Sequence, residues 1–476
     1  MQHAATAERD DPAIPVLPPP PEGRPAPAAP QPPPTLALPL ETRAALLADG
    51  GVHPVAWRAE ANAWAREADL RYRATTALRA ARPTDGDIRL GVKDTVDVAG
   101  FATRLGLRRY RHHPRRTAEA VRRLRGASVI AKLATPELGI GLVHGCRNPR
   151  FPHLAPSGSS TGSAVAVASH LCDVALGTDT VASTRLPAAA CGVVGLRTTH
   201  RPDGLDGVFP LSPSLDAVGW IARTADDLAY FWYRTGLGGS GTLPPATYEK
   251  TYRIGVVREV DEAFCAPEVR AALDGVSGLL SDAGHAVRPV RLGELWERRA
   301  AAYELCAYEA WRTYREWRER LDDDLDPATA RALDGAAVGE ARYAWLCAAR
   351  ERAREQAAAS FSGDAGVDAW LLPVTPGLPR AANAPAGNVS AVPHRDEADF
   401  DQRVGYCPVA AFAGLPALAL PVALDPVHRA PIALQLVGAP GSEAGLIQLA
   451  RQISRRVGHP VLPLAGPAGP AGGVAR

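Results

Sequence analysis

Two short segments place polar side chains where they could do chemistry. Lys93 ends the apolar stretch IRLGVK at 88–93, where a buried ammonium is costly unless it is paired or neutral. Its simplest structural role is an ion pair with Asp94 or Asp97. The serine-rich stretch PSGSSTGS at 156–163 runs directly into an apolar helix. Its free backbone N–H groups could hold an anion, or its Ser and Thr side chains could simply cap the helix.

A third segment, GTDTVASTRLPAA at 177–189, indicates a strand that breaks into a polar turn around Ser183. Taken alone, a serine in a turn is structural. A serine hydroxyl becomes a nucleophile only when a base takes its proton during attack. A lysine can be that base only if burial lowers its pKa from the usual value of about 10.4. Taken alone, none of the three segments establishes such chemistry, and each keeps its structural interpretation.

The elements that must position these segments alternate between helix and strand signals. Apolar residues at helical spacing from Leu46 to Arg82 predict one or two amphipathic helices. Alternation of this kind predicts an α/β fold, with a single domain built on a central mixed, mostly parallel β-sheet covered by helices. The further expected strands lie at 88–93, 128–133, 173–179, 191–197, 367–376, 415–424 and 431–438, and the further expected helices at 117–127, 161–171 and about 297–321.

The amino-acid composition indicates where the folded domain lies and which classes of partner are expected. Dense proline predicts a disordered tail over 1–40, and a Gly/Pro-rich end predicts a flexible tail over 466–476, so the folded domain is expected at 41–465. The formal net charge is +2, from 53 Lys plus Arg against 51 Asp plus Glu. Such a balance gives no overall field that would recruit nucleic acid or an anionic membrane, and neither partner is expected.

Cysteine usage and the chain ends suggest a location. The seven cysteines are odd in number and contain no C-x-x-C pair, which argues against a disulfide framework and a structural zinc site. The sequence has no signal-peptide pattern at its start and no run of about 18 apolar residues. A cytoplasmic protein is expected. No metal-ligand spacing and no phosphate-binding or dinucleotide motif occurs, so we expect no cofactor and no metal.

The three segments together resemble the signature of one enzyme family. Amidase signature enzymes carry G-V-K-D, then G-G-S-S-G-G-S before an apolar helix, then G-T-D-T-G-G-S-x-R-x-P-A and C-G-V-V-G-L. The resemblance spans roughly 45–455, and its central block is specific. The corresponding stretches are GVKD at 91–94, SGSSTGS at 157–163, GTDTVASTRLPA at 177–188 and CGVVGL at 191–196.

The resemblance implies an amidase signature fold and the cleavage of linear carbon–nitrogen amide bonds through an acyl-enzyme, or acyl transfer by the same intermediate. It implies that Ser183 is the nucleophile, Ser159 the relay serine and Lys93 the terminal base. It also implies a cis peptide between Gly158 and Ser159. The relay run backwards would protonate the leaving amine. The expected substrate is a small-molecule amide, and a homodimer is plausible from the resemblance alone.

The turn before Ser183 has further implied roles. Backbone N–H groups from Thr180, Val181, Ala182 and Ser183 would form the oxyanion hole. Asp179 and Arg185 flank this turn and are expected to brace it as an ion pair. The segment that would line the acyl pocket, about 297–350, resembles the family least. Its aromatic residues recur at helical spacing and are interpreted as core: Tyr303, Tyr308, Trp311, Tyr314 and Trp317.

The chain departs from the family pattern in both loops. Val181 and Ala182 replace the two glycines before the nucleophile, and a side chain there costs about 1–3 kcal/mol if the position needs a positive φ. Ser157 and Thr161 also replace glycines, and ordinary loop conformations are expected for both. The alternative to an active enzyme is therefore a catalytically impaired, amidase-like protein that binds a ligand or docks a partner.

Two further interpretations were weighed. Residues 158–162 satisfy G-x-S-x-G, the nucleophile elbow of α/β-hydrolases, which would make Ser160 the nucleophile of an esterase. That motif needs a buried strand before it, and the stretch NPRFPHLAPS at 148–157 holds three prolines instead. The basic cluster at 104–116 could contact nucleic acid, but the neutral overall charge favours a solvated loop or a rim that attracts an anionic substrate.

Overall fold

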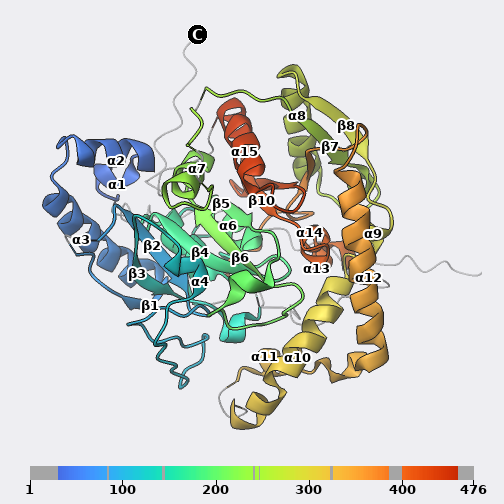
Figure 1. The fold of residues 1–476 in the computed structure, drawn as a ribbon, viewed down its shortest axis with the longest axis horizontal. Helices are drawn as coiled ribbons and strands as arrows, with labels where there is room; N and C mark the ends of the chain where they lie inside the picture. Colours follow the sequence, from blue (N-terminus) through green and yellow to red (C-terminus); the bar gives the residue numbers. More distant parts are fainter. Residues whose placement is uncertain are drawn as a thin grey trace, which may run out of the picture.

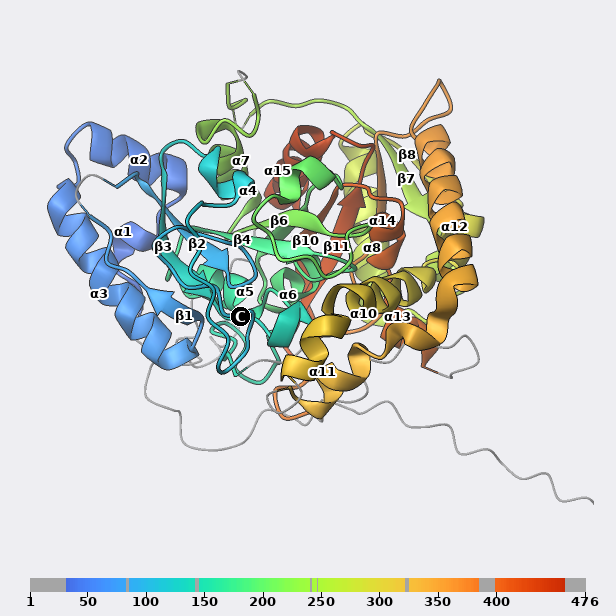
Figure 2. The same cartoon turned by 60° about the horizontal axis from the view of Figure 1, so that its bottom comes forward.

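Eleven strands form one continuous sheet in the part of the chain that the structure describes. This computed structural model describes residues 31–82, 85–141, 145–239, 242–245, 247–321, 325–384 and 399–458. The sheet order is β1-β3-β2-β4-β6-β5-β10-β11-β9-β7-β8, and helices flank it (Figures 1 and 2). The strands are β1 (Thr75–Leu78), β2 (Ile88–Lys93), β3 (Ala127–Leu133), β4 (Val174–Asp179), β5 (Val194–Arg197), β6 (Ala217–Ala222), β7 (Arg253–Val257), β8 (Ala286–Val290), β9 (Ala369–Pro373), β10 (Ala417–Leu424) and β11 (Pro431–Val437).

The sheet is mixed, as expected, but not mostly parallel. Four pairings are parallel: β2 with β3, β2 with β4, β7 with β8, and β7 with β9. The other six are antiparallel, namely β1–β3, β4–β6, β5–β6, β5–β10, β10–β11 and β9–β11. Neighbours such as β10 and β11 are joined by a short connection at 425–430, which allows only antiparallel pairing. The expected parallel character therefore holds only around β2 and β7.

The helices follow the apolar pattern of the sequence. All eight residues of α5 are buried, because this helix is apolar on every side and packs against β2, β3 and β4. The helices are α1 (Pro34–Ala37), α2 (Leu40–Ala48), α3 (Pro54–Tyr72), α4 (Glu119–Arg122), α5 (Thr161–Ala168), α6 (Arg185–Ala190), α7 (Ala225–Arg234), α8 (Pro267–Asp282), α9 (Glu294–Glu297), α10 (Ala301–Leu321), α11 (Pro327–Ala332), α12 (Gly339–Ser360), α13 (Phe400–Val404), α14 (Pro408–Phe412) and α15 (Glu443–Val457).

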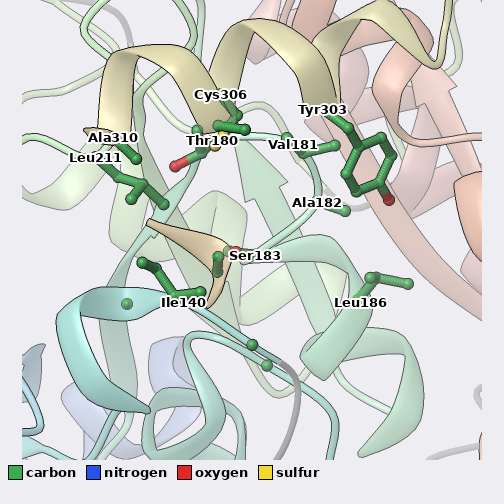
Figure 3. Close-up of a pocket in the computed structure, with 15 residues that line it drawn as sticks. Ile140, Thr180, Val181, Ala182, Ser183, Leu186, Leu211, Tyr303, Cys306 and Ala310 are labelled. Carbon is green, nitrogen blue, oxygen red and sulfur yellow. The ribbon is translucent and has the colours of Figure 1, made fainter. Parts of the chain in front are cut away.

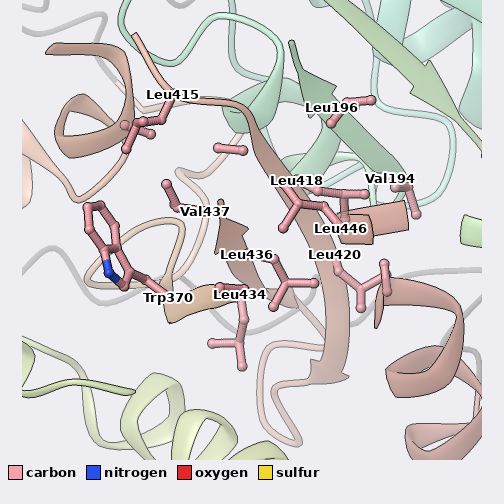
Figure 4. Close-up of a cluster of buried hydrophobic side chains, with 14 of the residues drawn as sticks. Val194, Leu196, Trp370, Leu415, Leu418, Leu420, Leu434, Leu436, Val437 and Leu446 are labelled. Atoms are coloured by element: carbon pink, nitrogen blue, oxygen red, sulfur yellow. The ribbon is translucent and has the colours of Figure 1, made fainter. Parts of the chain in front are cut away.

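The largest core cluster joins the two halves of the sheet. Figure 4 shows apolar side chains of β5, β10 and β11 packed together with Trp370 of β9 and Leu446 of α15. Full burial of a side chain of this kind stabilises a fold by about 1.5–3 kcal/mol. A second cluster lies between α3, α5 and the neighbouring strands. The core is therefore continuous across the sheet and holds β2 and β4 in fixed register.

The folded domain begins earlier than the predicted boundary at residue 41. Leu36 of α1 and Leu40 of α2 are almost completely buried. The Arg223 guanidinium donates to the carbonyl oxygens of Leu36 at 2.8 Å and Leu38 at 2.7 Å. These long-range bonds order a proline-rich segment that local signals assign to a tail. The remainder of the two predicted tails, 1–30 and 466–476, lies outside the described residues.

Element boundaries differ from the sequence prediction in other places. The helical pattern over 46–82 forms α2 and α3, but α3 ends at Tyr72, where Arg73 adopts a positive φ of 54°. The chain then forms the edge strand β1. The helix expected at 117–127 is a single turn, α4. Strands β6, β7 and β8 were not predicted, because their short apolar runs lack clear flanking signals. In the described part of the chain, no helix combines the length and apolar character needed to cross a bilayer.

A buried ion-pair cluster ties α2 to the strand that carries Lys93. The Asp173 carboxylate lies 2.5 Å from Arg43 of α2 and 2.6 Å from Arg89 of β2, and all three side chains are buried. Burial raises the pKa of Asp173, but the two guanidinium groups outweigh it and hold the pKa well below its usual range. The carboxylate is therefore charged in the folded protein and compensates two buried cations.

We expect Asp173→Asn to destabilise the protein by about 3–5 kcal/mol, because two buried guanidinium groups lose their counter-charge. Urea denaturation at pH 7 measures the change in the free energy of unfolding. Asp203→Asn, at an exposed position, is the matched control and should change it by less than about 0.5 kcal/mol. Equal stability of the two variants would show that the cluster contributes nothing to the fold.

Candidate active site

Lys93 is the last residue of β2 and is completely buried. Its Nζ donates to Ser159 Oγ at 2.8 Å and to Thr178 Oγ1 at 2.9 Å. The ion pairs with Asp94 or Asp97 that the sequence left open are not formed. Asp94 instead lies 3.1 Å from Lys132, and Asp97 accepts a hydrogen bond from Thr103. Among the described residues, Lys93 is therefore held by two hydroxyl groups and has no carboxylate in direct contact.

Three influences set the protonation of Lys93. Burial disfavours the ammonium form and lowers the pKa of Lys93 to about 7. The carboxylates of Asp216 and Asp179 act in the opposite direction and keep the pKa from falling further. A substantial fraction of the side chain is thus neutral near pH 7, so that Nζ can accept a proton from Ser159.

The serine loop presents Ser159 to this lysine. The Gly158–Ser159 peptide is cis, as the family resemblance implied. The Ser159 carbonyl oxygen accepts a hydrogen bond from Thr135 Oγ1 at 3.0 Å. Ser157 has a positive φ of 61°, so the expectation of an ordinary loop conformation was wrong for it. Thr161 begins α5, and its Oγ1 donates to the Ser157 carbonyl at 2.7 Å, which holds the loop in this conformation.

Ser183 lies on the turn between β4 and α6, in a segment where Ala182 and Thr184 are buried and Ser183 is half-buried. The Ser160 backbone N–H donates to the Ser183 carbonyl at 3.0 Å, which joins the serine loop to this turn. Figure 3 shows Ser183 beside Ile140, with Thr180 and Val181, which follow the end of β4, above it. The turn therefore exposes one hydroxyl to the neighbouring space while its flanks stay packed.

An ion-pair network lies behind the turn. Asp179 and Arg185 form the predicted ion pair at 3.0 Å, and Arg197 Nη1 lies 3.2 Å from the same carboxylate. Arg185 also donates to the Val181 carbonyl at 2.8 Å. Burial raises the pKa of Asp179, but the two guanidinium groups hold it well below the usual range. The sequence analysis did not identify Arg197 as a residue of the site. The one sequence feature that marks it is a cation in the apolar run CGVVGLR.

Two further residues of the site were also missed by the sequence analysis. Thr178 of β4 contacts Lys93, as described above. Asp216 accepts hydrogen bonds from Thr180 Oγ1 at 2.6 Å and from the Leu211 N–H at 2.8 Å. Burial raises the pKa of Asp216 to about 6, although these hydrogen bonds favour the carboxylate. In the sequence, Asp216 is marked only by its place in the motif PLSPSLDAVG at 210–219. The sequence analysis assigned this motif no role.

The replaced glycines do not distort the turn. Neither Val181 nor Ala182 is among the described residues with a positive φ. A side chain at either position therefore carries no left-handed backbone penalty. The elbow context for Ser160 is also absent from the described residues, because 148–157 form no strand and the Ser160 hydroxyl is buried and donates to the Thr178 carbonyl at 3.2 Å.

A cavity adjoins the turn (Figure 3). Its empty space, counted out to where it opens to solvent, is about 750 Å³. Gly139 lines the cavity and also lies beside the Lys93–Ser159 pair. A Cβ at residue 139 would lie 3.7 Å from Ser159 Oγ and 3.8 Å from Lys93 Nζ. The lining residues are Gly139, Ile140, Gly141, Gly158, Thr180, Val181, Ala182, Ser183, Leu186, Leu211, Tyr303, Cys306, Ala307, Ala310 and Ala332.

The aromatic residues of α10 divide between core and cavity. Tyr308 and Tyr314 are buried, and Trp317 packs against the same small cluster as Tyr314, as expected for core positions. Tyr303 packs against the largest core cluster and also lines the cavity, so the core interpretation is confirmed for it only in part. Helical spacing identifies a shared face but does not say which part of that face meets a cavity.

Comparison with known proteins decides the family. The family model described as Amidase matches residues 55–447, which is most of the chain. The chain belongs to the amidase signature family. It is 33% identical over 337 residues to 2-amino-5-chloromuconic acid deaminase of Comamonas testosteroni, covering 66% of this chain and 67% of that protein. It is 29% identical over 418 residues to mandelamide hydrolase of Pseudomonas putida, covering 79% of each.

A solved structure described as a crystal structure of amidase has the same fold. It matches with a TM-score of 0.75 at 29% identity, over 88% of this chain and 100% of that chain. The amidase signature fold expected from the sequence is thereby confirmed. The protein is an enzyme of this family, a hydrolase that acts on amides.

The pKa of Lys93 predicts how activity depends on pH. Only the neutral amine can accept a proton, so kcat/KM for an uncharged amide should rise tenfold per pH unit below about 7 and reach a plateau above it. Initial rates from pH 5 to 9, with the fold checked by circular dichroism at each pH, measure the profile. A profile that falls steadily above pH 7 in folded protein would contradict a lysine base.

Proposed function

We propose that this amidase hydrolyses the C–N bond of small linear amides through an acyl-enzyme on Ser183, with Ser159 and Lys93 as the proton relay. The observation that carries the proposal is the 2.8 Å contact between Lys93 Nζ and Ser159 Oγ in a fully buried setting. Ser183 is the half-buried hydroxyl on the adjoining turn, and it lines the cavity where an amide would bind.

The first half of the reaction forms the acyl-enzyme. Neutral Lys93 takes the Ser159 proton as Ser159 takes the Ser183 proton, and Ser183 Oγ bonds to the amide carbon. Negative charge develops on the carbonyl oxygen, where N–H groups from Thr180 to Ser183 would bind it. Loss of one such donor typically costs about 2.7–4 kcal/mol in other hydrolases. When the C–N bond breaks, the relay runs backwards and delivers the proton to the leaving nitrogen.

The second half releases the acid. Water attacks the acyl carbon, gives its proton to the same relay, and Ser183 leaves as a hydroxyl. Transfer of the acyl group to an amine in place of water would use the same intermediate. The names of the two relatives, a deaminase and a hydrolase, support transfer to water. Cytoplasmic location and a homodimer remain predictions.

The rival proposal is a binding protein on this fold whose turn no longer forms an oxyanion hole. Its main argument was the loss of two glycines, and negative φ values at Val181 and Ala182 weaken it. All three proposed catalytic positions are occupied by residues able to play their parts. Chemical labelling of Ser183 separates the two proposals.

Replacing the proposed base should remove turnover without unfolding the protein. We expect Lys93→Ala to lower kcat by about 10²- to 10⁴-fold, the usual contribution of a general base. The exposed Lys250 provides the control, since Lys250→Ala removes a lysine far from any described catalytic contact. Steady-state rates on one primary amide, with thermal unfolding of each variant, make the comparison. Wild-type rates in folded Lys93→Ala would exclude Lys93 from the mechanism.

The three serines should differ in their reaction with a fluorophosphonate, which bonds to an activated serine. Ser183→Ala should lose both turnover and labelling. Ser159→Ala should slow labelling by a large factor without abolishing it, because Ser159 assists proton transfer but forms no bond to the probe. Ser160→Ala should have the least effect. Mass spectrometry of the labelled peptide locates the adduct, and an adduct on Ser160 would refute this mechanism.

A further inference from the structure

Helix α10 lines most of the side of the cavity that faces the Ser183 turn. Tyr303, Cys306, Ala307 and Ala310 all belong to α10 and line the cavity from one face of the helix, and Ala332 of α11 adds to the same wall. Figure 3 shows Tyr303, Cys306 and Ala310 on this helix, facing the turn that carries Ser183. Positions 303, 306, 307 and 310 follow helical spacing. The wall is thus built largely from small side chains.

The described lining of the cavity offers no counter-charge to a bound group. None of its lining residues in the described part of the chain has a charged side chain. Apart from Ser183, the two hydroxyl groups of the described lining are already engaged, since Tyr303 donates to the Val404 carbonyl at 3.1 Å and Thr180 donates to Asp216. A charged substituent placed against α10 would lose its water and gain no partner, which is strongly unfavourable.

A buried carboxylate fixes the position of this wall. Glu309 of α10 accepts hydrogen bonds from the hydroxyl groups of Ser212 and Ser214, both at 2.6 Å, and from the Ser214 N–H at 3.0 Å. These bonds join α10 to the segment 210–214, whose Leu211 lines the cavity. Because both sides are tied together, α10 cannot move outward easily to admit a larger group.

We propose that this cavity selects amides whose acyl group is uncharged and apolar, and that Ala310 sets the size limit. The inference rests on the proposed function, because it takes the cavity as the acyl site of the Ser183 acyl-enzyme. It adds the chemical class of the substrate and the residue that determines specificity.

The wild-type enzyme tests the charge rule with three amides of similar shape. Isovaleramide carries an isopropyl group where malonamate carries a carboxylate and malonamamidine a cationic amidinium. We expect kcat/KM for isovaleramide to exceed both others by roughly 100-fold or more. Hydrolysis of malonamate or malonamamidine as fast as isovaleramide would overturn the charge rule.

The size limit is tested on α10 itself. We expect Ala310→Leu to lower the ratio of kcat/KM for phenylacetamide to that for acetamide by at least about tenfold, because the added atoms occupy the space of the ring. Glu316→Leu introduces the same side chain at an exposed position of α10 and should leave the ratio unchanged. An unchanged ratio in folded Ala310→Leu would overturn the role of Ala310, and Ala310→Val is the substitute if the leucine variant does not fold.

Labelling by a short-chain fluorophosphonate separates failure of this inference from failure of the proposed function. Labelling of wild-type Ser183 together with amide turnover, but without discrimination among the three amides, would overturn the inference alone. A wild-type enzyme that is not labelled and turns over none of the amides would overturn the proposed function and, with it, the inference.

Discussion

The burial of one amine is the constraint on which the site depends. Lys93 ends β2, all of whose residues are buried, and β2 pairs in parallel with β4, which ends at Asp179. Parallel neighbours bring their carboxyl ends to one edge of a sheet, so the lysine and the Ser183 turn emerge side by side. Helix α5 packs against both strands and starts just after Ser159. Sheet geometry thus assembles the three groups and also removes water from Lys93.

The charges around the lysine are balanced. Burial lowers the pKa of Lys93, and the carboxylates of Asp216 and Asp179 restore part of its proton affinity. Asp179 is in turn paired with Arg185 and Arg197, which limits its influence on Lys93 and fixes the turn. The same residues therefore act both on the shape of the turn and on the pKa of the base.

The sequence analysis predicted the features that lie within a single motif. It did not predict contacts between residues that are far apart in the chain. The buried strand that ends at Lys93 was predicted from its run of apolar residues, and the cis peptide before Ser159 was implied by the family resemblance. The antiparallel pairings were not predicted, since a strand signal carries no information about the direction of its neighbour. The hydrogen bond between Ser212 and Glu309 joins positions 97 residues apart, and the order of Leu36 depends on Arg223. Such contacts are set by tertiary packing, which no local pattern encodes.

Direct titration of Lys93 tests the central claim. The chain contains three lysines, Lys93, Lys132 and Lys250, so a protein labelled with ¹³C at the lysine ε-carbon gives three resonances. Lys250→Arg and Lys132→Arg variants assign two of them, and the third is Lys93. The account predicts that the Lys93 resonance titrates near pH 7. A Lys93 resonance that stays in the ammonium form up to pH 9 in folded protein would contradict the account.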